Sequence, residues 1–459
     1  MDCGRAREYA SRVALRQALR YLGKDPERKL GVLLDWAERL AVDPRHKEEV
    51  RCAKALLGDP GNNWRSLAVN LLTNTHPNVR ERLGVNFFLN AGLIGIPAQY
   101  AAARRLGVSV PFALLIDPTE RCNLRCVGCW AGEYEGLRDL DLDLMDRVVG
   151  EAEDLGIHFF VVSGGEPLIR ADDLFTLARK HRESVFHVFT NGTLIDRETA
   201  GRVISLGNVT LAISLEGFKE STDARRGPGT FDMVVNAMDA LRNEGAVFGF
   251  SVTYHRYNTA EVGGDEFVDF LVSSGCSFGW YFTYVPVGTD ADPGFMASPE
   301  QRAFMFHQVR RFRKTKPIFI ADFWNDGEFS GGCIAGGRRY LHINAAGEVE
   351  PCAFIHYSTC NIRDVSLVDA LRSPLMRAYQ KHQPFNHNML RPCPLIDNPE
   401  MLEKIVRESG ARPTQKNAGD VRSLCLPLRQ YAADWGRISA ELWERSRAGA
   451  EDAARALGR

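Results

Sequence analysis

Apolar residues in the middle of the chain form short runs, each followed by a turn and then by a helical pattern. The runs are rich in β-branched and aromatic residues, which favour strands. Strands that alternate with helices in this way predict repeated βα units and a parallel sheet. Six units predict an α/β fold built as a partial (β/α)6 barrel of the TIM type. The predicted strands are residues 111–116, 158–163, 185–190, 209–214, 248–254 and 278–285.

Different patterns flank this central part. Residues 5–107 carry Leu and Val at helical spacing with breaks at Pro60 and Pro77, which predicts an all-α region. Beyond residue 316 the alternation ends, and two short apolar runs around Gly347 predict a β-hairpin, because glycine accepts the positive φ of a tight turn. We therefore predict three parts: helices in residues 1–109, the barrel in 110–315, and a C-terminal region in 316–459 with the hairpin (340–344 and 348–354) and helices at 367–379, 400–408 and 426–457.

The composition is that of an ordinary globular protein. Of the 459 residues, 45% are hydrophobic and 25% charged, and the net charge is −1, which excludes a globally basic nucleic-acid binder. Residues 1–109 nevertheless hold 18 Lys and Arg against 11 Asp and Glu, a net +7. That excess favours an acidic partner or a membrane surface, or it is simply a solvated helical face.

No segment has the length or polarity of a transmembrane helix. The most apolar early stretch, residues 85–97, is short and contains Asn86 and Asn90. The first ten residues are charged and resemble no secretory signal. We expect a cytoplasmic protein, with peripheral contact at the inner face of the membrane through residues 1–109 as the open alternative.

The strongest chemical signal is a group of three cysteines directly after the first predicted strand. Cys122, Cys126 and Cys129 follow the spacing C-x3-C-x2-C. Iron–sulfur clusters normally take four cysteines. Three thiolates on a compact loop would leave one iron open to another ligand, which suits a catalytic cluster. The alternative is a zinc site, but zinc sites usually bring a second ligand pair about 12–20 residues further on, and residues 131–162 contain no Cys and only one His, His158.

A second motif follows the second strand. Gly164 and Gly165 let a ligand approach the backbone closely, and Glu166 and Pro167 complete the sequence GGEP. Parallel barrels place their active sites at this end of their strands. With the three-cysteine loop, this motif resembles the radical S-adenosylmethionine (radical SAM) superfamily. The resemblance implies a [4Fe-4S] cluster on Cys122, Cys126 and Cys129, S-adenosylmethionine (SAM) bound to its open iron, and cleavage of SAM to a 5′-deoxyadenosyl radical.

Later strand ends supply further cofactor contacts in the superfamily. The GGEP motif receives the ammonium of the methionyl group, and an arginine pairs with its carboxylate. The contacts implied here are Asn191, Ser214, Glu216, Arg225 and Thr253, besides Gly164, Gly165, Glu166 and Pro167. Glu216 departs from the related SxDG pattern, which has Asp. Arg226 is an alternative to Arg225, and His255 is either a contact or a structural histidine.

Cysteines also recur in the C-terminal region. Cys333, Gly347 and Cys352 resemble the opening of SPASM and twitch domains, which hold auxiliary iron–sulfur clusters. The dense cysteine run of a full SPASM domain is missing, so we expect one auxiliary [4Fe-4S] cluster. The expected ligands are Cys333, Cys352, Cys393 and Cys425, with Cys360 as the alternative to Cys425.

These features predict a radical SAM enzyme that abstracts hydrogen from an unactivated C–H bond. The alternative is a non-catalytic iron–sulfur electron-transfer protein. The expected partners are a peptide or lipid substrate and a reduced flavodoxin- or ferredoxin-type donor, with no nucleic acid. Family members with SPASM or twitch domains often modify peptides, whereas the helical start and the apolar stretch 85–97 favour a lipid acyl chain.

Overall fold

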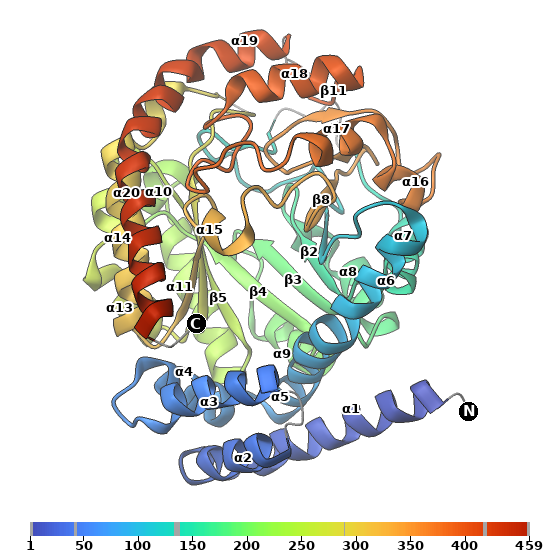
Figure 1. Cartoon of the computed structure of the whole chain (residues 1–459), viewed down its shortest axis with the longest axis vertical. Coiled ribbons are helices and arrows are strands. Elements are labelled where there is room, and N and C mark those ends of the chain that lie inside the picture. Colours follow the sequence, from blue (N-terminus) through green and yellow to red (C-terminus); the bar gives the residue numbers. More distant parts are fainter. Residues whose placement is uncertain (1–2, 41–43, 133–137, 289, 416–419, 457–459) are drawn as a thin grey trace.

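The computed structural model describes residues 3–40, 44–132, 138–288, 290–415 and 420–456. Its centre is a curved nine-stranded sheet in the order β7-β6-β5-β4-β3-β2-β1-β8-β9 (Figure 1). All neighbouring strands are parallel except the antiparallel pair β8 and β9. The strands are β1 Ala113–Ile116, β2 Phe159–Val162, β3 Val185–Thr190, β4 Val209–Ser214, β5 Phe248–Tyr254, β6 Phe278–Thr283, β7 Phe319–Asp322, β8 Tyr340–Ile343 and β9 Val349–Glu350.

The predicted α/β barrel class is confirmed, since six strands lie where the sequence pattern places them. One face of each strand packs against helices on the outside, where Phe160, Leu211 and Phe250 are fully buried. The other face lines the interior, and Phe159, Trp280 and Phe282 there keep partial exposure. The covering elements are α7 Leu142–Asp154, η2 Pro167–Arg170, α8 Ala171–Lys180, α9 Arg197–Leu206, α10 Lys219–Arg226, α11 Thr230–Glu244, α12 Thr259–Val262, α13 Asp265–Ser273, η3 Pro293–Phe295 and α14 Pro299–Thr315.

The sheet extends beyond residue 315, where we placed the end of the barrel. β7 pairs with β6, and β8, the first hairpin strand, pairs with β1 in parallel register. The predicted hairpin is present, with Gly347 at φ 86° in its turn. The C-terminal region is therefore joined to the barrel through the sheet itself.

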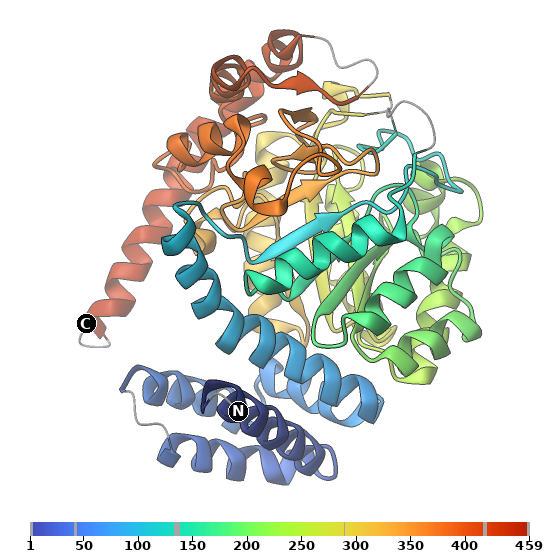
Figure 2. The ribbon, with the colours of Figure 1, turned by 90° about the vertical axis from the view of Figure 1, so that its right-hand side faces the viewer.

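The N-terminal helices form a layer beneath the barrel (Figures 1 and 2). One of them, η1, is a π-helix that continues directly into α6. The layer contains α1 Cys3–Leu22, α2 Pro26–Leu40, α3 Pro44–Gly58, α4 Asn63–Asn74, α5 Pro77–Gly84, η1 Val85–Gly95 and α6 Ile96–Leu106. Within the described residues, we find no helix with the length and apolar character needed to span a bilayer.

The C-terminal region packs over the opposite end of the barrel, and its last helix runs down the outside of α14 (Figure 1). It contains α15 Gly327–Ser330, β10 Tyr357–Ser358, α16 Leu367–Leu371, α17 Pro374–His382, α18 Pro399–Ser409, β11 Arg412–Pro413, α19 Val421–Cys425, η4 Leu426–Leu428 and α20 Arg429–Ala456. Residue 457, the end of the predicted last helix, lies outside the described residues.

A buried ion pair ties the C-terminal region to α14. Arg302 and Asp397 are both fully buried, with Nη1 and Oδ1 2.5 Å apart. The Arg302 guanidinium also lies 4.2 Å from the Trp435 ring centre on α20. Asp397 in turn accepts a hydrogen bond from the Cys393 backbone N–H at 3.0 Å. The pair therefore fixes the loop that carries Cys393.

Loss of this pair should be strongly destabilising. Arg302→Met leaves the Asp397 carboxylate buried without its cation, and we expect a loss of about 3–5 kcal/mol in the free energy of unfolding. Chemical denaturation of the purified protein measures it. Arg197→Met, which removes a 91% exposed arginine from an ion pair with Glu244, is the control and should change stability by less than about 1 kcal/mol. Equal effects of the two substitutions would contradict this assignment.

Candidate functional site

The three cysteines of the C-x3-C-x2-C motif lie together on the loop after β1. Burial, followed by smaller effects of Glu166, Cys129 and Cys126, raises the pKa of Cys122 to about 11. The Cys122 Sγ also accepts a hydrogen bond from the Leu124 backbone N–H at 3.4 Å. Gly128 makes the turn between Cys126 and Cys129 at φ 64°, where a Cβ would meet the Tyr284 ring at 2.6 Å.

Cationic and amide groups surround these thiols. Arg226 Nη1 lies 4.0 Å from Cys126 Sγ, and Asn191 Nδ2 lies 3.9 Å from Cys122 Sγ. Such donors suit an anionic cluster of thiolates and iron. Among the described residues, no set of three or more His, Cys, Asp or Glu is placed to hold a single metal ion. The three thiols, with an arginine and an amide beside them, are the donor types that an iron–sulfur cluster takes.

The GGEP turn is bonded to the backbone of the cysteine loop. The Gly165 N–H donates to the Thr119 carbonyl at 2.9 Å, and the Glu166 N–H donates to the Arg121 carbonyl at 2.8 Å. A Cβ on Gly165 would lie 2.2 Å from the Arg121 carbonyl oxygen. Only glycine permits this approach, so the turn and the cysteine loop form one unit.

The Glu166 side chain is fully engaged within the protein. Its carboxylate accepts hydrogen bonds from the Leu168 N–H at 3.0 Å, the Thr190 hydroxyl at 2.8 Å and the Asn191 N–H at 2.7 Å. Burial raises its pKa. Glu166 thus connects η2, which begins at Pro167, to the end of β3. The missing side chains of Gly164 and Gly165 make room for the backbone carbonyls of Thr119 and Arg121.

Glu216 holds both arginines that we considered for the cofactor carboxylate. Its buried Oε1 accepts hydrogen bonds from Arg225 Nη1 and, at 2.5 Å, from Arg226 Nη2. Oε2 is buried and has no hydrogen-bond partner in the part of the chain that the structure describes. Arg225 also exchanges hydrogen bonds with the Val127 backbone, at 3.0 and 3.2 Å. The arginine–glutamate group therefore braces the cysteine loop.

The ends of β4 and β5 complete this face of the barrel. Ser214 and Thr253 are partly exposed at their strand ends. His255 stacks on Phe295 with ring centres 4.0 Å apart, and burial lowers its pKa to about 4. The ring is therefore neutral near pH 7; its Nδ1 accepts from the Tyr257 N–H, so Nε2 carries the proton. That buried donor has no acceptor among the described residues, which fits a nucleoside nitrogen or hydroxyl beside it.

Four C-terminal cysteines gather in a second cluster around Tyr379. Cys333, Cys352, Cys393 and Cys425 share one apolar cluster, whereas Cys360 packs against the other core and interacts with Ser373. Burial raises the pKa of the Tyr379 phenol, and the thiols of all four cysteines raise it further. Its hydroxyl is buried without a hydrogen-bond partner in the described ranges. This set of four thiols fits a fully ligated iron–sulfur cluster.

Several residues in these sites could not be predicted from the sequence. Tyr340 O–H donates to Cys352 Sγ at 2.7 Å, and both groups are buried. Tyr340 opens a strand with no distinctive spacing, so only the fold reveals this contact. The same holds for Tyr379, which belongs to an ordinary amphipathic helix, α17.

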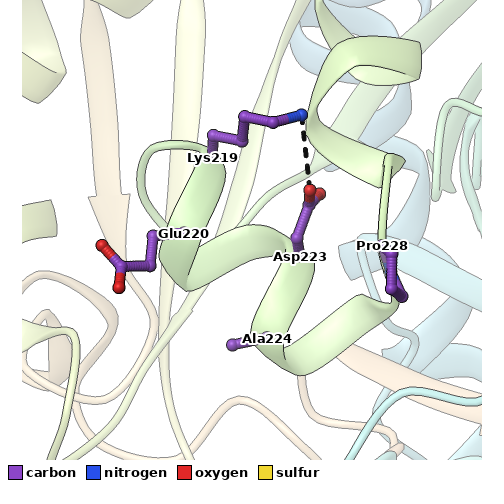
Figure 3. Close-up of a pocket in the computed structure, with 5 residues that line it drawn as sticks. All are labelled: Lys219, Glu220, Asp223, Ala224 and Pro228. Carbon is purple, nitrogen blue, oxygen red and sulfur yellow. Dashed lines mark ion pairs between the residues drawn. The ribbon is translucent and has the colours of Figure 1, made fainter.

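A surface hollow on α10 carries no comparable chemistry. It is lined by Lys219, Glu220, Asp223, Ala224 and Pro228, and Figure 3 shows Lys219 turned toward Asp223. Their charged atoms are 3.5 Å apart, and Asp223 also accepts from the Gly229 and Phe231 N–H groups. These side chains therefore hold the turn between α10 and α11.

The fit of the GGEP turn can be tested by adding one methyl group. Gly165→Ala should displace the Arg121 carbonyl and cost about 1–3 kcal/mol of unfolding free energy, as overpacking does. Gly201→Ala in α9 is the matched control, because no atom lies within 4 Å of its added Cβ, and it should stabilise the helix by about 1 kcal/mol. Chemical denaturation of both variants shows whether the free energy of unfolding falls or rises. An unchanged free energy of unfolding in Gly165→Ala would contradict the packing described.

Comparison with known proteins agrees with this geometry. The model of the radical SAM superfamily matches residues 116–264, and the model of the SPASM iron–sulfur cluster-binding domain matches residues 333–394. Similar proteins include the mycofactocin maturase MftC of Mycolicibacterium smegmatis, 32% identical over 54% of this chain and 66% of the relative. The AdoMet-dependent heme synthase of Methanosarcina barkeri is 25% identical over 56% of this chain and 80% of the relative.

Coverage of the curated relatives is partial. The alignments span just under two thirds of MftC and 37% of the Fe-coproporphyrin III synthase of Methanosarcina barkeri. Among solved structures, SuiB of Streptococcus suis bound to its precursor peptide SuiA superposes with a TM-score of 0.54 at 15% identity, over 72% of this chain and 88% of SuiB. This likeness shows a shared fold.

The radical SAM model covers Cys122, Cys126 and Cys129, and the SPASM model covers Cys333, Cys352, Cys360 and Cys393 but ends before Cys425. Radical SAM domains bind a [4Fe-4S] cluster and SAM, and SPASM domains bind auxiliary iron–sulfur clusters. The chain therefore contains a radical SAM domain in residues 116–264 and a SPASM domain in residues 333–394.

Proposed function

We propose that this protein uses SAM to abstract a hydrogen atom from an unactivated C–H bond of its substrate. The observation that carries the proposal is the joint unit of three interacting thiols and the GGEP turn at the carboxyl ends of β1 and β2. When bound to Cys122, Cys126 and Cys129, the cluster supplies the electron that splits the sulfonium of SAM into methionine and a 5′-deoxyadenosyl radical. A reduced flavodoxin- or ferredoxin-type protein is the proposed donor of that electron.

The surrounding residues would orient SAM. The backbone of Gly164 and Gly165 would face the methionyl ammonium, while buried Glu166 keeps the turn in place. Asn191, Ser214 and Thr253 lie at neighbouring strand ends and would contact the rest of the cofactor. The His255 Nε2–H would donate to the nucleoside.

Glu216 would position Arg225 and Arg226, the two candidates for pairing with the methionyl carboxylate. In a protein without this carboxylate, an arginine here would be free to pair with the methionyl carboxylate. Here Glu216 Oε1 already holds both guanidinium groups. Their remaining N–H groups are therefore the ones available to the cofactor.

Cys333, Cys352, Cys393 and Cys425 would hold one auxiliary [4Fe-4S] cluster. Cys425 is preferred to Cys360 because its thiol acts on the same Tyr379 phenol as the other three. A fully ligated cluster would relay or accept the electron that remains after product formation.

The substrate would bind in the barrel between the two clusters. Phe189, Phe282 and Phe354 form part of an aromatic lining there, with Phe282 5.8 Å from Phe189 and 6.2 Å from Phe354 between ring centres. A peptide side chain is supported by the maturase MftC and by the SuiB–SuiA complex. A lipid acyl chain is the second candidate, supported by this apolar lining and by an exposed apolar surface in residues 1–109, through which we propose peripheral contact with the inner face of the membrane.

Release of 5′-deoxyadenosine tests the chemistry directly. The anaerobically reconstituted protein, given SAM and dithionite, should produce 5′-deoxyadenosine, measured by liquid chromatography and mass spectrometry. Cys126→Ala should reduce the product at least a hundredfold, whereas Cys52→Ala, which removes an exposed thiol on α3, should leave it unchanged. The loss in Cys126→Ala is large because loss of even an outer-shell partner of a metal ligand typically costs about 10- to 100-fold. No product from protein with full cluster occupancy would support the alternative, an electron-transfer protein.

A pair of cysteine variants tests the auxiliary ligands. We expect Cys425→Ala to lower bound iron and to convert or abolish the auxiliary cluster, because its thiol lies within the four-cysteine group. Cys360→Ala should retain the full iron content of the wild type. Iron and sulfide assays with electron paramagnetic resonance (EPR) measure both, and the reverse result would reassign the fourth ligand to Cys360.

The Tyr340 hydroxyl should make the auxiliary cluster easier to reduce. A hydrogen bond to a ligand sulfur withdraws electron density and stabilises the added electron. Tyr340→Phe should therefore lower the midpoint potential of the auxiliary cluster by tens of millivolts, roughly the effect of 1 kcal/mol on a one-electron couple. A redox titration followed by EPR checks this. The control is Tyr281→Phe, whose phenol donates to the Val262 carbonyl in the outer core of the barrel, and it should leave the potential unchanged. An unchanged potential in Tyr340→Phe would show that this contact does not tune the cluster.

A further inference from the structure

The helical rod formed by η1 and α6 buries Val85, Leu89 and Ala102 together with three amide side chains, and it presents further apolar residues to solvent. Asn86, Asn90 and Gln99 are at most 6% exposed. Their side-chain N–H groups donate to backbone carbonyls at the base of the barrel, including those of Ser184, Glu183 and Gly156, at 3.0, 2.8 and 2.8 Å. These bonds fix the rotation of the rod about its axis.

The opposite side of the rod is a line of exposed apolar residues, which we name the outer stripe. It consists of Phe88, Leu93, Ile96 and Tyr100, whose exposed fractions are 62%, 69%, 38% and 52%. Phe88 and Leu93 are five residues apart within the π-helix. Leu93 and Ile96 are three residues apart, and Ile96 and Tyr100 are four apart, so each side chain lies close to one helical turn from the next. A surface helix ordinarily shows the reverse arrangement, with charged residues outward.

Large apolar side chains exposed together mark a binding surface. The outer stripe is unlike isolated exposed residues, because the buried amides prevent the rod from turning it inward. Phe87, 42% exposed, widens it, with its ring centre 5.3 Å from that of Phe88.

The charges beside the stripe indicate which surface it binds. No Asp or Glu occurs from residue 82 to residue 116. Arg104 and Arg105 are exposed one turn beyond Tyr100, and Arg339 Nη1 donates to the Tyr100 hydroxyl at 3.4 Å. Exposed apolar side chains, an aromatic hydroxyl and flanking arginines, with no acid in the segment that forms the rod, match an anionic lipid surface.

We propose that the outer stripe docks the protein onto a membrane containing anionic phospholipid. Phe88, Leu93, Ile96 and Tyr100 enter the boundary between headgroups and acyl chains, and Arg104 and Arg105 contact lipid phosphates. This proposal rests on the proposed function, because it names the residues that would make the peripheral membrane contact included there. Vesicle binding needs neither SAM nor a reductant, so failure of the docking site is distinguishable from failure of the radical chemistry.

The test is co-sedimentation of the full-length, cluster-loaded protein with vesicles of phosphatidylglycerol and phosphatidylcholine in equal parts. We expect binding at low salt that weakens with added salt and with pure phosphatidylcholine. Phe88→Ser/Leu93→Ser/Tyr100→Ser should reduce binding about tenfold or more, since apolar insertion supplies much of the affinity. The control, Met233→Ser/Phe304→Ser/Phe329→Ser, removes three exposed apolar side chains from α11, α14 and α15 and should bind as the wild type does.

Three results would overturn the proposal. The first is that the wild type fails to sediment with anionic vesicles. The second is that the stripe variant binds these vesicles as well as the wild type does. In the third, light scattering shows a dimer of the wild type and a monomer of the stripe variant, with no vesicle binding by either. That last pattern would assign the stripe to a second copy of the chain.

Discussion

The parallel pairing of β1 with β8 is the constraint on which the arrangement of both sites depends. β1 leads into the cysteine loop, and β8 opens the hairpin that carries Cys352, so both leave the sheet at the same edge. A buried chain of charged groups lies at this junction. His342 Nε2 is 2.6 Å from Asp117 Oδ2, and its Nδ1 is 2.8 Å from Glu350 Oε2. Burial alone would lower the pKa of His342, but the two carboxylates raise it to about 10, so the ring stays cationic at neutral pH.

That junction also lies next to the space between the two cysteine clusters. Trp130, which follows Cys129, stacks on His356 with ring centres 6.2 Å apart, and its ring centre is 5.8 Å from that of Phe354. Phe354 in turn lies 5.0 Å from Trp324, beside the auxiliary cysteines. Aromatic groups therefore connect the two sites, and in the proposed reaction they would exclude water from the region where the radical acts.

Much of this fold could be predicted because the sequence pattern repeats it. Six strands and the hairpin at Gly347 follow from periodicity and turn residues, and the three-cysteine loop follows from its spacing. The auxiliary cysteines are what the resemblance to SPASM and twitch domains implies. Strand β7 could not be predicted, because it has only four residues and begins with the exposed Phe319, so it shows no run of buried positions. The engagement of Arg225 and Arg226 by Glu216 depends on side chains that meet only after α10 has folded over the cysteine loop. In η1, Asn86 and Asn90 seem polar interruptions in the sequence alone, yet they form the buried face of the rod.

The central claim is that Cys122, Cys126 and Cys129 hold a cluster with one iron open to SAM. Mössbauer spectroscopy of the iron-57-labelled protein, recorded with and without SAM, tests it most directly. The account predicts two [4Fe-4S] clusters, with one iron of one cluster changing its isomer shift when SAM is added, and with that cluster missing from the Cys122→Ala/Cys126→Ala/Cys129→Ala variant. A spectrum that SAM leaves unchanged, or a triple variant that retains both clusters, would contradict it.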